Sequence, residues 1–441
     1  MKRISILMLL TLIVFSACSK NEPEAVVAEK EFTGTLTLGI QGGDIPATYN
    51  REGRRLAEEE KSTDLLMYRD VLLADFPYKV EIRNYAADAT TIKMDVDIAG
   101  GDAPDAYWDY LGRVNKYANS KYALPINLTF EELDDYLPSA LAPVMKDGEL
   151  YALPGTFWAA VMVVNKPLVE SVGLGSILED GTWTIDEFLM IVDAVKAKYG
   201  PEYYGYPLFA SGTGGDYWSS FGWFSSFGAK LYENGKIVVN SKEGIEALEF
   251  MKFMADAEIV PPGIAGLDYK VAISAMPKGT FVAAANSTNY TTRLVDPLNG
   301  VEKWQAIMME WPRAPGVEKV PLAVGPDAGM VFASSKHPVE AMELIRYLNS
   351  TKMQTLTSKA MSRYPSRKSV GNDFSTDPQW VIAAKMIEKN GTFDTGVGLE
   401  HYAEVRGLWP STLQAIFTEE MTIQEAVDRF VEEGTAILEA E

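Results

Sequence analysis

Residues 78–108 read YKVEIRNYAADATTIKMDVDIAGGDAPDAYW, and this stretch decides the class of fold. Its beginning alternates apolar and polar residues, with Val80 and Ile82 on one side, which is typical of a strand. The segment TTIKMDVDIAG has a helical composition and ends at a glycine pair, and DAYW after the following turn predicts a second short strand. Strand and helix therefore alternate along this part of the chain.

The residues before this stretch extend the same alternation. TLTLGI at 35–40 has the period of a strand, and residues 50–75 are mostly helix formers with a late apolar face. The order strand, helix, strand, helix, strand predicts a parallel sheet that is covered by helices. The fold class is therefore predicted to be α/β.

The rest of the chain carries both helix signals and strand signals. Capping boxes and other helix starts are predicted at Thr184 with Glu187, Thr422 with Glu425, Ser241, Pro338 and Pro378. Between 278 and 334 the segments GTFVAAAN, KWQAIMMEWP and AGMVFAS predict strands. Helices interrupted by strands indicate two α/β lobes through which the chain passes more than once.

Residues 1–17 have the pattern of a signal peptide. Two basic residues precede an uninterrupted apolar run over 4–15, which is well short of the roughly 20 residues that a membrane-spanning helix needs. FSAC at 15–18 resembles the bacterial lipobox, so we expect Cys18, the only cysteine, to be lipidated and to become the first mature residue. Residues 18–33 have the polar composition of a tether. These features predict an exported protein that is lipid-anchored at the periplasmic or extracellular face of the cell envelope.

Composition and motifs argue against several functions. The net charge of −21 repels phosphate backbones, so nucleic acid is not an expected partner. The motifs HExxH, CxxC, GxSxG and GxxxxGK[ST] do not occur, and the two histidines, His337 and His401, are expected to be helix-start and packing residues. We therefore predict no catalytic residue, no metal and no cofactor. A pair of carboxylates acting on a sugar stays open, because sequence spacing does not reveal which acidic residues face each other.

Residues 216–228, DYWSSFGWFSSFG, are dense in aromatic side chains. One helical face is aromatic and is predicted to be core: Tyr217, Phe221 and Phe224. Trp218 and Trp223 lie off that face. Because aromatic rings also stack on flat apolar ligand faces, these two tryptophans are candidates for ligand contacts.

Several segments together resemble the extracellular solute-binding proteins of family 1, the sugar-capturing lipoproteins of ABC importers. The matching segments are GGDAPDAYW at 100–108, DGELYALP at 147–154 with VMVVNKPLVESVGL after it, GTWTIDEF at 181–188, FGAKLYENGKIVVNSKEGIEALEFM at 227–251 and SSKHPVEAMELIRYLNS at 334–350. In order and spacing they cover most of the mature chain. They indicate the family but not the ligand.

The resemblance implies two α/β lobes of the class II periplasmic-binding-protein type, which close on a ligand by a hinge motion. Three chain crossings near 129, 301 and 350 would divide the chain into one lobe of 34–128 with 302–349 and another of 129–301 with 350–441. It also implies a carbohydrate ligand, a permease and an ATPase as partners, attachment to the membrane through the lipid only, and a monomeric state.

A sugar site needs aromatic rings for the apolar face of the sugar ring and polar side chains for its hydroxyl groups. Positions that match ligand-contacting places in the family, or that follow a strand facing the expected cleft, supply both. The candidate ligand-binding residues are Trp108, Asp109, Trp158, Trp218, Trp223, Asn286, Asn289, Arg363, Tyr364 and Trp409.

Three functional hypotheses stay open at this level. The first is the carbohydrate-binding subunit of an ABC importer, with an oligosaccharide as the expected ligand. The second is an extracytoplasmic enzyme acting on polysaccharide, which would turn its ligand over. The third keeps the binding fold but changes the cargo, for example to a peptide, or the output, to a sensor.

Overall fold

The computed structural model describes residues 32–41, 73–85, 90–118, 121–212, 215–269, 272, 279–287, 306–361, 363–370 and 378–440. Residues 34–441 form one compact unit, and the fold below is that of this unit. The predicted signal peptide, Cys18, nearly all of the tether and most of the predicted helix over 50–75 lie outside the described residues, as does Asn289.

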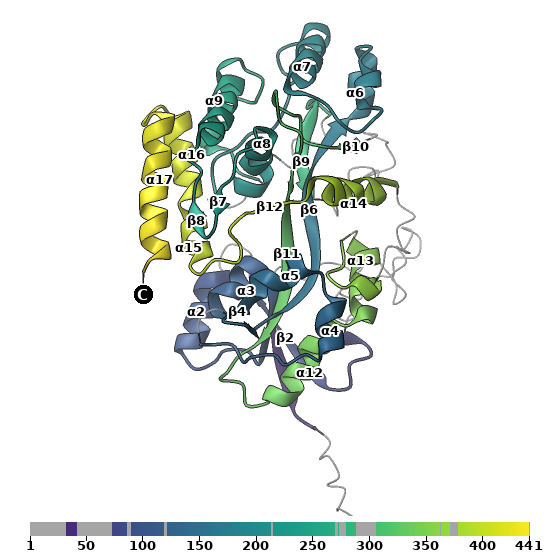
Figure 1. Cartoon of the computed structure of the whole chain (residues 1–441), viewed down its shortest axis with the longest axis vertical. Helices are drawn as coiled ribbons and strands as arrows, with labels where there is room; N and C mark the ends of the chain where they lie inside the picture. The colour runs from purple at the N-terminus through teal and green to yellow at the C-terminus, as the bar shows by residue number, and fades with distance from the viewer. Residues whose placement is uncertain are drawn as a thin grey trace, which may run out of the picture. The chain divides into compact units, whose positions relative to one another are not determined.

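A mixed sheet of eight strands forms the centre of the unit (Figure 1). Its strands are β1 (Thr35–Gln41), β2 (Lys79–Tyr85), β3 (Ala106–Tyr110), β6 (Leu153–Asn165), β9 (Ala283–Ser287), β10 (Ala306–Met309), β11 (Leu322–Val331) and β12 (Thr392–Phe393). The main path runs β10-β6-β11-β3-β1-β2, while β9 pairs with β6 and β12 with β11. Strand β1 pairs in parallel with both β2 and β3, as the alternation in the sequence predicts.

Strands β6 and β11 are long and extend from one half of the unit into the other, as Figure 1 shows. The first part of β6 pairs with β11 as far as Ala159, and its last part pairs with β9 and β10 from Ala160 onward. β11 pairs with β3 at its end and with β12 at its start. The chain therefore passes between the two halves of the unit on continuous strands.

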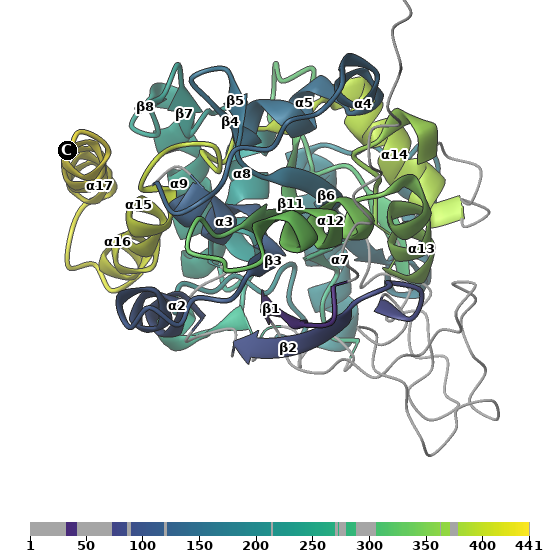
Figure 2. The ribbon, with the colours of Figure 1, turned by 90° about the horizontal axis from the view of Figure 1, so that it is seen from below.

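For the description below, the helices and strands are divided into two groups, which we call the first and the second lobe. The first lobe consists of β1, β2 and β3 with α2 (Thr90–Ala99), α3 (Leu111–Ala118) and α12 (Pro338–Leu348). Figure 2 shows α12 crossing the face of β3 and β11, with which it is in contact. The second lobe consists of β9 and β10 with α6 (Lys166–Ser171), α7 (Ile185–Tyr199), α8 (Phe221–Ser226), α9 (Lys242–Asp256), α14 (Pro378–Asn390), α15 (Tyr402–Gly407), α16 (Trp409–Phe417) and α17 (Ile423–Leu438).

The remaining elements lie outside these two groups. They are α4 (Phe130–Asp135), α5 (Pro138–Leu141), β4 (Met145–Lys146), β5 (Glu149–Leu150), β7 (Tyr232–Glu233), β8 (Lys236–Ile237), α13 (Thr351–Met361) and the short turns η2 (Ala142–Val144), η3 (Gly175–Leu178), η4 (Asp216–Ser220), η5 (Ile264–Gly266) and η7 (Lys368–Val370). The lobe boundaries near 129, 301 and 350 stay a prediction, because residues 34–441 form one unit. The grouping used here differs from them at β10, which pairs with the last part of β6 and is therefore grouped with the second lobe.

The predicted helix starts are confirmed. Thr184 and Thr422 both form complete capping boxes, and the Ser241 side chain caps α9. Helices α12 and α14 begin at Pro338 and Pro378, where the missing backbone N–H is not needed. The hydrogen bonds that cap these helix starts can therefore be predicted from the sequence.

The aromatic stretch 216–228 folds as the π-helical turn η4 followed by α8. Its predicted core face is confirmed, because Tyr217, Phe221 and Phe224 are at most 5% exposed. Gly222 allows the close contact of α8 with Trp311, since a Cβ at this position would lie 2.0 Å from the Trp311 ring.

Alkaline pH is expected to destabilise the fold through its buried tyrosines. Burial raises the pKa of Tyr85, Tyr107, Tyr110, Tyr117, Tyr206, Tyr217, Tyr232 and Tyr402. In the unfolded chain these phenols ionise near pH 10, so their stabilising contribution is complete below pH 10 and is lost as pH rises above it, by about 1.4 kcal/mol per pH unit for each tyrosine.

Urea unfolding at pH 8, 9.5 and 10.5, with absorbance at 295 nm to count ionised tyrosines, checks this expectation. The midpoint should fall steeply above pH 10, and the 295 nm signal should rise together with unfolding. Ionisation of most tyrosines in the folded protein near pH 10, without loss of stability, would contradict it.

Candidate functional site

Trp158 and Trp218 form a stacked pair where the long strand β6 changes partners. Their ring centroids are 4.7 Å apart with an interplanar angle of 28°. Trp158 precedes Ala159, the last residue of β6 that pairs with β11 before β9 takes its place, and Trp218 comes from η4. Tyr269 continues the row, 5.8 Å from Trp218. All three rings are partly exposed, so this row presents an aromatic surface at the junction of the lobes.

The backbone around the pair fixes both tryptophans. Gly325 on β11 lies opposite Trp158, and a Cβ at Gly325 would come within 1.9 Å of the Trp158 ring. Only glycine leaves room for this ring, since real Cβ atoms do not approach so closely. The Tyr206 hydroxyl donates a hydrogen bond of 2.8 Å to the carbonyl oxygen of Trp218, which holds η4 in place.

Trp108 lies at the same junction but does not join the stacked row. It is partly exposed on β3, and its Nε1 is 3.4 Å from the place where a Cβ of Gly155 would be. That Nε1 is buried, and it has no hydrogen-bond partner among the described residues. It is a donor that a ligand or a solvent molecule could satisfy.

Arg363 and Tyr364 attach the segment after α13 to both long strands. Arg363 forms an ion pair with Asp327 on β11, and Tyr364 packs on Phe157 of β6 with ring centroids 5.4 Å apart. The backbones of Phe157 and Tyr364 also exchange hydrogen bonds of 2.8 and 2.7 Å. Burial raises the pKa of Asp327, although Arg363 opposes this shift. Both predicted residues therefore lie at the junction, where their visible role is to position the strands.

Two predicted tryptophans are core residues, and their assignment as ligand contacts is corrected. Trp223 is 0% exposed and packs against Phe188, Tyr206, Phe250 and Trp311. Trp409 is 3% exposed, contacts Phe221, Phe224 and Phe430, and donates a hydrogen bond to Ser220. A ring enclosed in this way has no face left for a ligand.

The polar candidates are corrected in part as well. The carboxylate of Asp109 already accepts hydrogen bonds from the Tyr107 hydroxyl, the Tyr110 backbone N–H and two nitrogens of Arg113. A carboxylate has about four such positions, so Asp109 has none to offer a sugar hydroxyl. Asn286 is 1% exposed within β9, paired with Val161 of β6. Of the ten candidates, the structure therefore brings Trp108, Trp158, Trp218, Arg363 and Tyr364 to the junction.

A polar and aromatic cluster beside the tryptophan pair was missed. Its members are Tyr110, Asp216, Tyr217, Thr395, Tyr402 and Arg406. Tyr217 was predicted only as core, and the bonded partners lie between 107 and 292 residues apart in the chain. No local signal in the sequence connects segments this distant.

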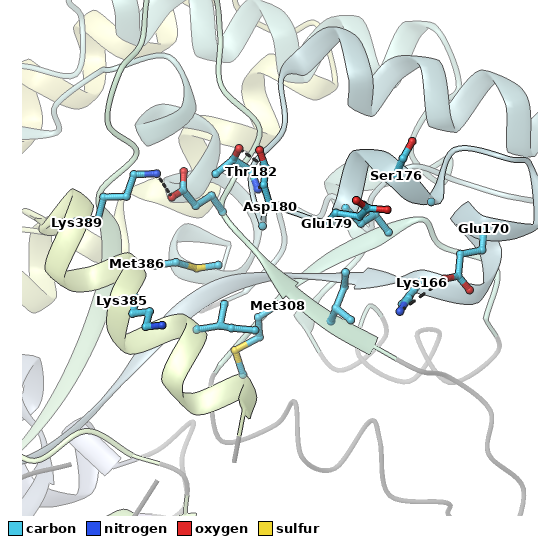
Figure 3. A pocket seen from close by; sticks show the side chains of 16 residues that line it. Lys166, Glu170, Ser176, Glu179, Asp180, Thr182, Met308, Lys385, Met386 and Lys389 are labelled. Atoms are coloured by element: carbon cyan, nitrogen blue, oxygen red, sulfur yellow. Dashed lines mark hydrogen bonds and ion pairs between the residues drawn. The ribbon is translucent and has the colours of Figure 1, made fainter. Parts of the chain in front are cut away.

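A separate hollow of about 670 Å³ lies in the second lobe (Figure 3). It is bounded by α6, η3, β10 and α14, and it contains the ion pairs Lys389 with Glu310 at 3.0 Å and Lys166 with Glu170 at 3.6 Å. Burial alone would raise the pKa of Glu310, but Arg313 and Lys389 hold it below its ordinary value. Among the residues that the structure describes, its lining has no aromatic side chain and none of the predicted site residues.

Other kinds of site receive no support within the described ranges. In these residues no group of His, Cys, Asp and Glu side chains could hold a metal ion. No described helix is long and apolar enough to cross a membrane.

Residues 71–385 match the family model of the bacterial extracellular solute-binding proteins. The chain belongs to this family. The solute-binding protein described here also shares its fold with solved binding proteins. A solute-binding protein of an ABC transporter from Thermotoga lettingae, bound with alpha-D-tagatose, aligns with a TM-score of 0.73 at 19% identity over 92% of this chain and 100% of that one.

Two further solved structures share the fold. T. maritima MalE3 with bound maltose gives a TM-score of 0.72 at 20% identity, covering 91% of this chain and 99% of that one. The maltotriose-binding protein of Thermus thermophilus gives 0.70 at 20% identity, covering 91% and 100%. No curated protein matches. The predicted family resemblance and the two-lobed periplasmic-binding-protein fold are thus confirmed.

Proposed function

We propose that this solute-binding protein captures a carbohydrate for an ABC importer, and that the Trp158 and Trp218 pair is the platform on which the sugar lies. The observation that carries the proposal is the partly exposed stacked pair at the junction of the lobes. A sugar ring has an apolar face of C–H groups that packs on an indole, and its hydroxyl groups need donors and acceptors around the rim. Trp108 Nε1 is a buried donor at the same junction.

The solved relatives support a sugar as the cargo. Three of them are named for, or bound with, tagatose, maltose and maltotriose. Two of these sugars, maltose and maltotriose, contain more than one sugar unit. We therefore favour an oligosaccharide, bound when the two lobes close on it by a hinge motion.

An enzyme acting on polysaccharide is the second candidate. Such an enzyme needs two carboxyl groups facing each other across the sugar. Three acidic residues near the junction, the buried Asp109 and Asp216 and the half-buried Asp327, are each paired with an arginine instead. This pairing favours binding over hydrolysis, and the family description favours it too.

The function is tested by adding mono- and oligosaccharides and peptides to the mature protein. Tryptophan fluorescence and melting temperature report binding, and chromatography of the same mixtures reports product. A ligand with a Kd near 1 μM at hundredfold excess should add about 2.7 kcal/mol to the free energy of unfolding. A saturable shift with intact sugar is the expected result. Cleaved sugar would establish the enzyme, and a response to peptides alone would replace the sugar as cargo.

Anchoring is part of the proposal and gives its own prediction. We expect Cys18→Ala to abolish lipid modification, because Cys18 carries the thiol to which the lipid would be attached and would be the first mature residue. Mass spectrometry of the protein purified from membranes should show an acylated N-terminal Cys18 in the wild type and an unmodified, released protein in the variant. An unmodified wild-type protein that still fractionates with membranes would show another mode of attachment. The permease and ATPase remain the proposed partners at that membrane.

A further inference from the structure

Three tyrosine hydroxyl groups meet between the lobes. Tyr110 ends β3 in the first lobe, Tyr217 lies on η4, and Tyr402 begins α15 in the second lobe. The Tyr110 hydroxyl oxygen is 2.8 Å from that of Tyr217 and 3.0 Å from that of Tyr402. All three side chains are at most 9% exposed. Buried hydroxyl groups need partners, and here each lobe supplies the partners of the other.

The hydrogen bonds have a single consistent direction. Tyr217 donates to Thr395 Oγ1 at 2.9 Å, so its one proton is used. Tyr110 must then donate to Tyr217, and Tyr402 must donate to Tyr110, since each hydroxyl has one proton and two acceptor positions. Aligned hydroxyl chains of this kind strengthen one another. We call the set Tyr402, Tyr110, Tyr217 and Thr395 the tyrosine relay.

Neighbouring residues are adapted to the relay. Gly112 on α3 leaves room for the Tyr402 ring, because a Cβ at Gly112 would lie 2.6 Å from that ring. The Arg406 guanidinium lies over the Tyr110 and Tyr217 rings, 5.7 and 5.4 Å from their centroids, and forms an ion pair with Asp216. The two lobes therefore touch here through a closely fitted contact.

Tyr217 connects the relay to the tryptophan pair. Its ring meets Trp158 edge-on at 5.2 Å and lies 6.5 Å from Trp218. The hydroxyl group of Tyr217 thus forms a hydrogen bond with Tyr110 of the first lobe, while its ring packs against Trp158 of the stacked pair. A change in the contact between Tyr110 and Tyr217 must alter the packing beside Trp158.

We infer that the tyrosine relay is an interlobe latch, in which Tyr110, Tyr217 and Tyr402 act as positioning residues that raise ligand affinity without touching the ligand. The latch holds the two lobes in the arrangement of this structure, and it sets the Trp158 and Trp218 pair in its stacked geometry. The part of this inference that concerns affinity rests on the proposed sugar-binding function.

The test compares Tyr110→Phe with Tyr117→Phe. Tyr117 is a matched control, because it is 2% exposed and its hydroxyl bonds Asp95 and Thr91 inside the first lobe. Stopped-flow fluorescence with maltose and maltotriose should show a dissociation rate about tenfold higher for Tyr110→Phe, with an unchanged association rate, since removing one such hydroxyl costs about a factor of ten. Tyr117→Phe should bind as the wild type does.

Two measurements without sugar separate failure of the latch from failure of the proposed function. The exciton-coupled circular dichroism of the stacked indoles should weaken in Tyr110→Phe and stay unchanged in Tyr117→Phe. Small-angle scattering should show a larger radius of gyration for Tyr110→Phe alone. A wild-type protein that binds no sugar would refute the proposed function while these two signals still test the latch. Equal signals from wild type and Tyr110→Phe, or equal shifts in both variants, would overturn the latch.

Discussion

Replacement of Trp218 by alanine is expected to raise the Kd for the sugar by about 30-fold to 1000-fold. Removing a central aromatic contact from a binding site costs roughly 2–4 kcal/mol, and every 1.4 kcal/mol is a factor of ten. Trp218 is the middle ring of the row, 4.7 Å from Trp158 and 5.8 Å from Tyr269, so its loss interrupts the whole surface. Isothermal titration calorimetry with the best sugar measures the effect.

Three companion variants show whether this effect belongs to the platform. Trp218→Phe should recover part of the affinity, because it restores a flat apolar ring. Gly325→Ala should also weaken binding, since its Cβ would displace the Trp158 ring, which it would approach to 1.9 Å. Trp183→Phe should lower the melting temperature without changing the Kd, because Trp183 is a core residue that bonds the Glu310 carbonyl. An unchanged Kd in both Trp218→Ala and Gly325→Ala would mean that the sugar binds elsewhere.

Replacement of Arg406 by methionine is expected to lower the free energy of unfolding by about 3–5 kcal/mol. Asp216 is 2% exposed, and Arg406 is its charged partner, with one contact at 3.0 Å. Removing the guanidinium leaves a carboxylate buried without a counter-charge, which is among the most costly changes that a fold can suffer. Urea unfolding at pH 7 measures the loss.

The double variant Asp216→Asn with Arg406→Met is the control for this charge effect. It removes both charges, so most of the stability should return, because a buried ion pair itself contributes little beyond a neutral replacement. Lys230→Met removes a cation from an exposed pair with Glu233 and should leave the urea midpoint nearly unchanged, because solvent screens such a pair. If the Arg406→Met and Lys230→Met variants lose equal stability, the Asp216 pair is not a buried structural pair.

The corrected residues show where sequence reasoning reached its limit. Trp218 and Trp223 come from one short stretch, but Trp218 is partly exposed beside Trp158 while Trp223 is fully buried. A five-residue π-helical turn precedes α8. Side chains on this turn point in other directions than they would on a regular α-helix. Helical periodicity with 3.6 residues per turn does not anticipate such a turn. Asp109 was a reasonable polar candidate, and only the position of Arg113 and Tyr107 shows that its carboxylate is already occupied.

The sequence by itself determined the α/β class, the parallel pairing around β1, the helix starts at Thr184, Ser241 and Thr422, and the family. These properties depend on residues close together in the chain, through apolar periodicity and capping hydrogen bonds. Only the tertiary structure decided which tryptophans meet, and it alone revealed the tyrosine relay and the Asp216 pair with Arg406. Those contacts join segments more than a hundred residues apart in the relay and 190 apart in the ion pair. Their geometry depends on how distant segments come together in the folded unit, which no local pattern encodes.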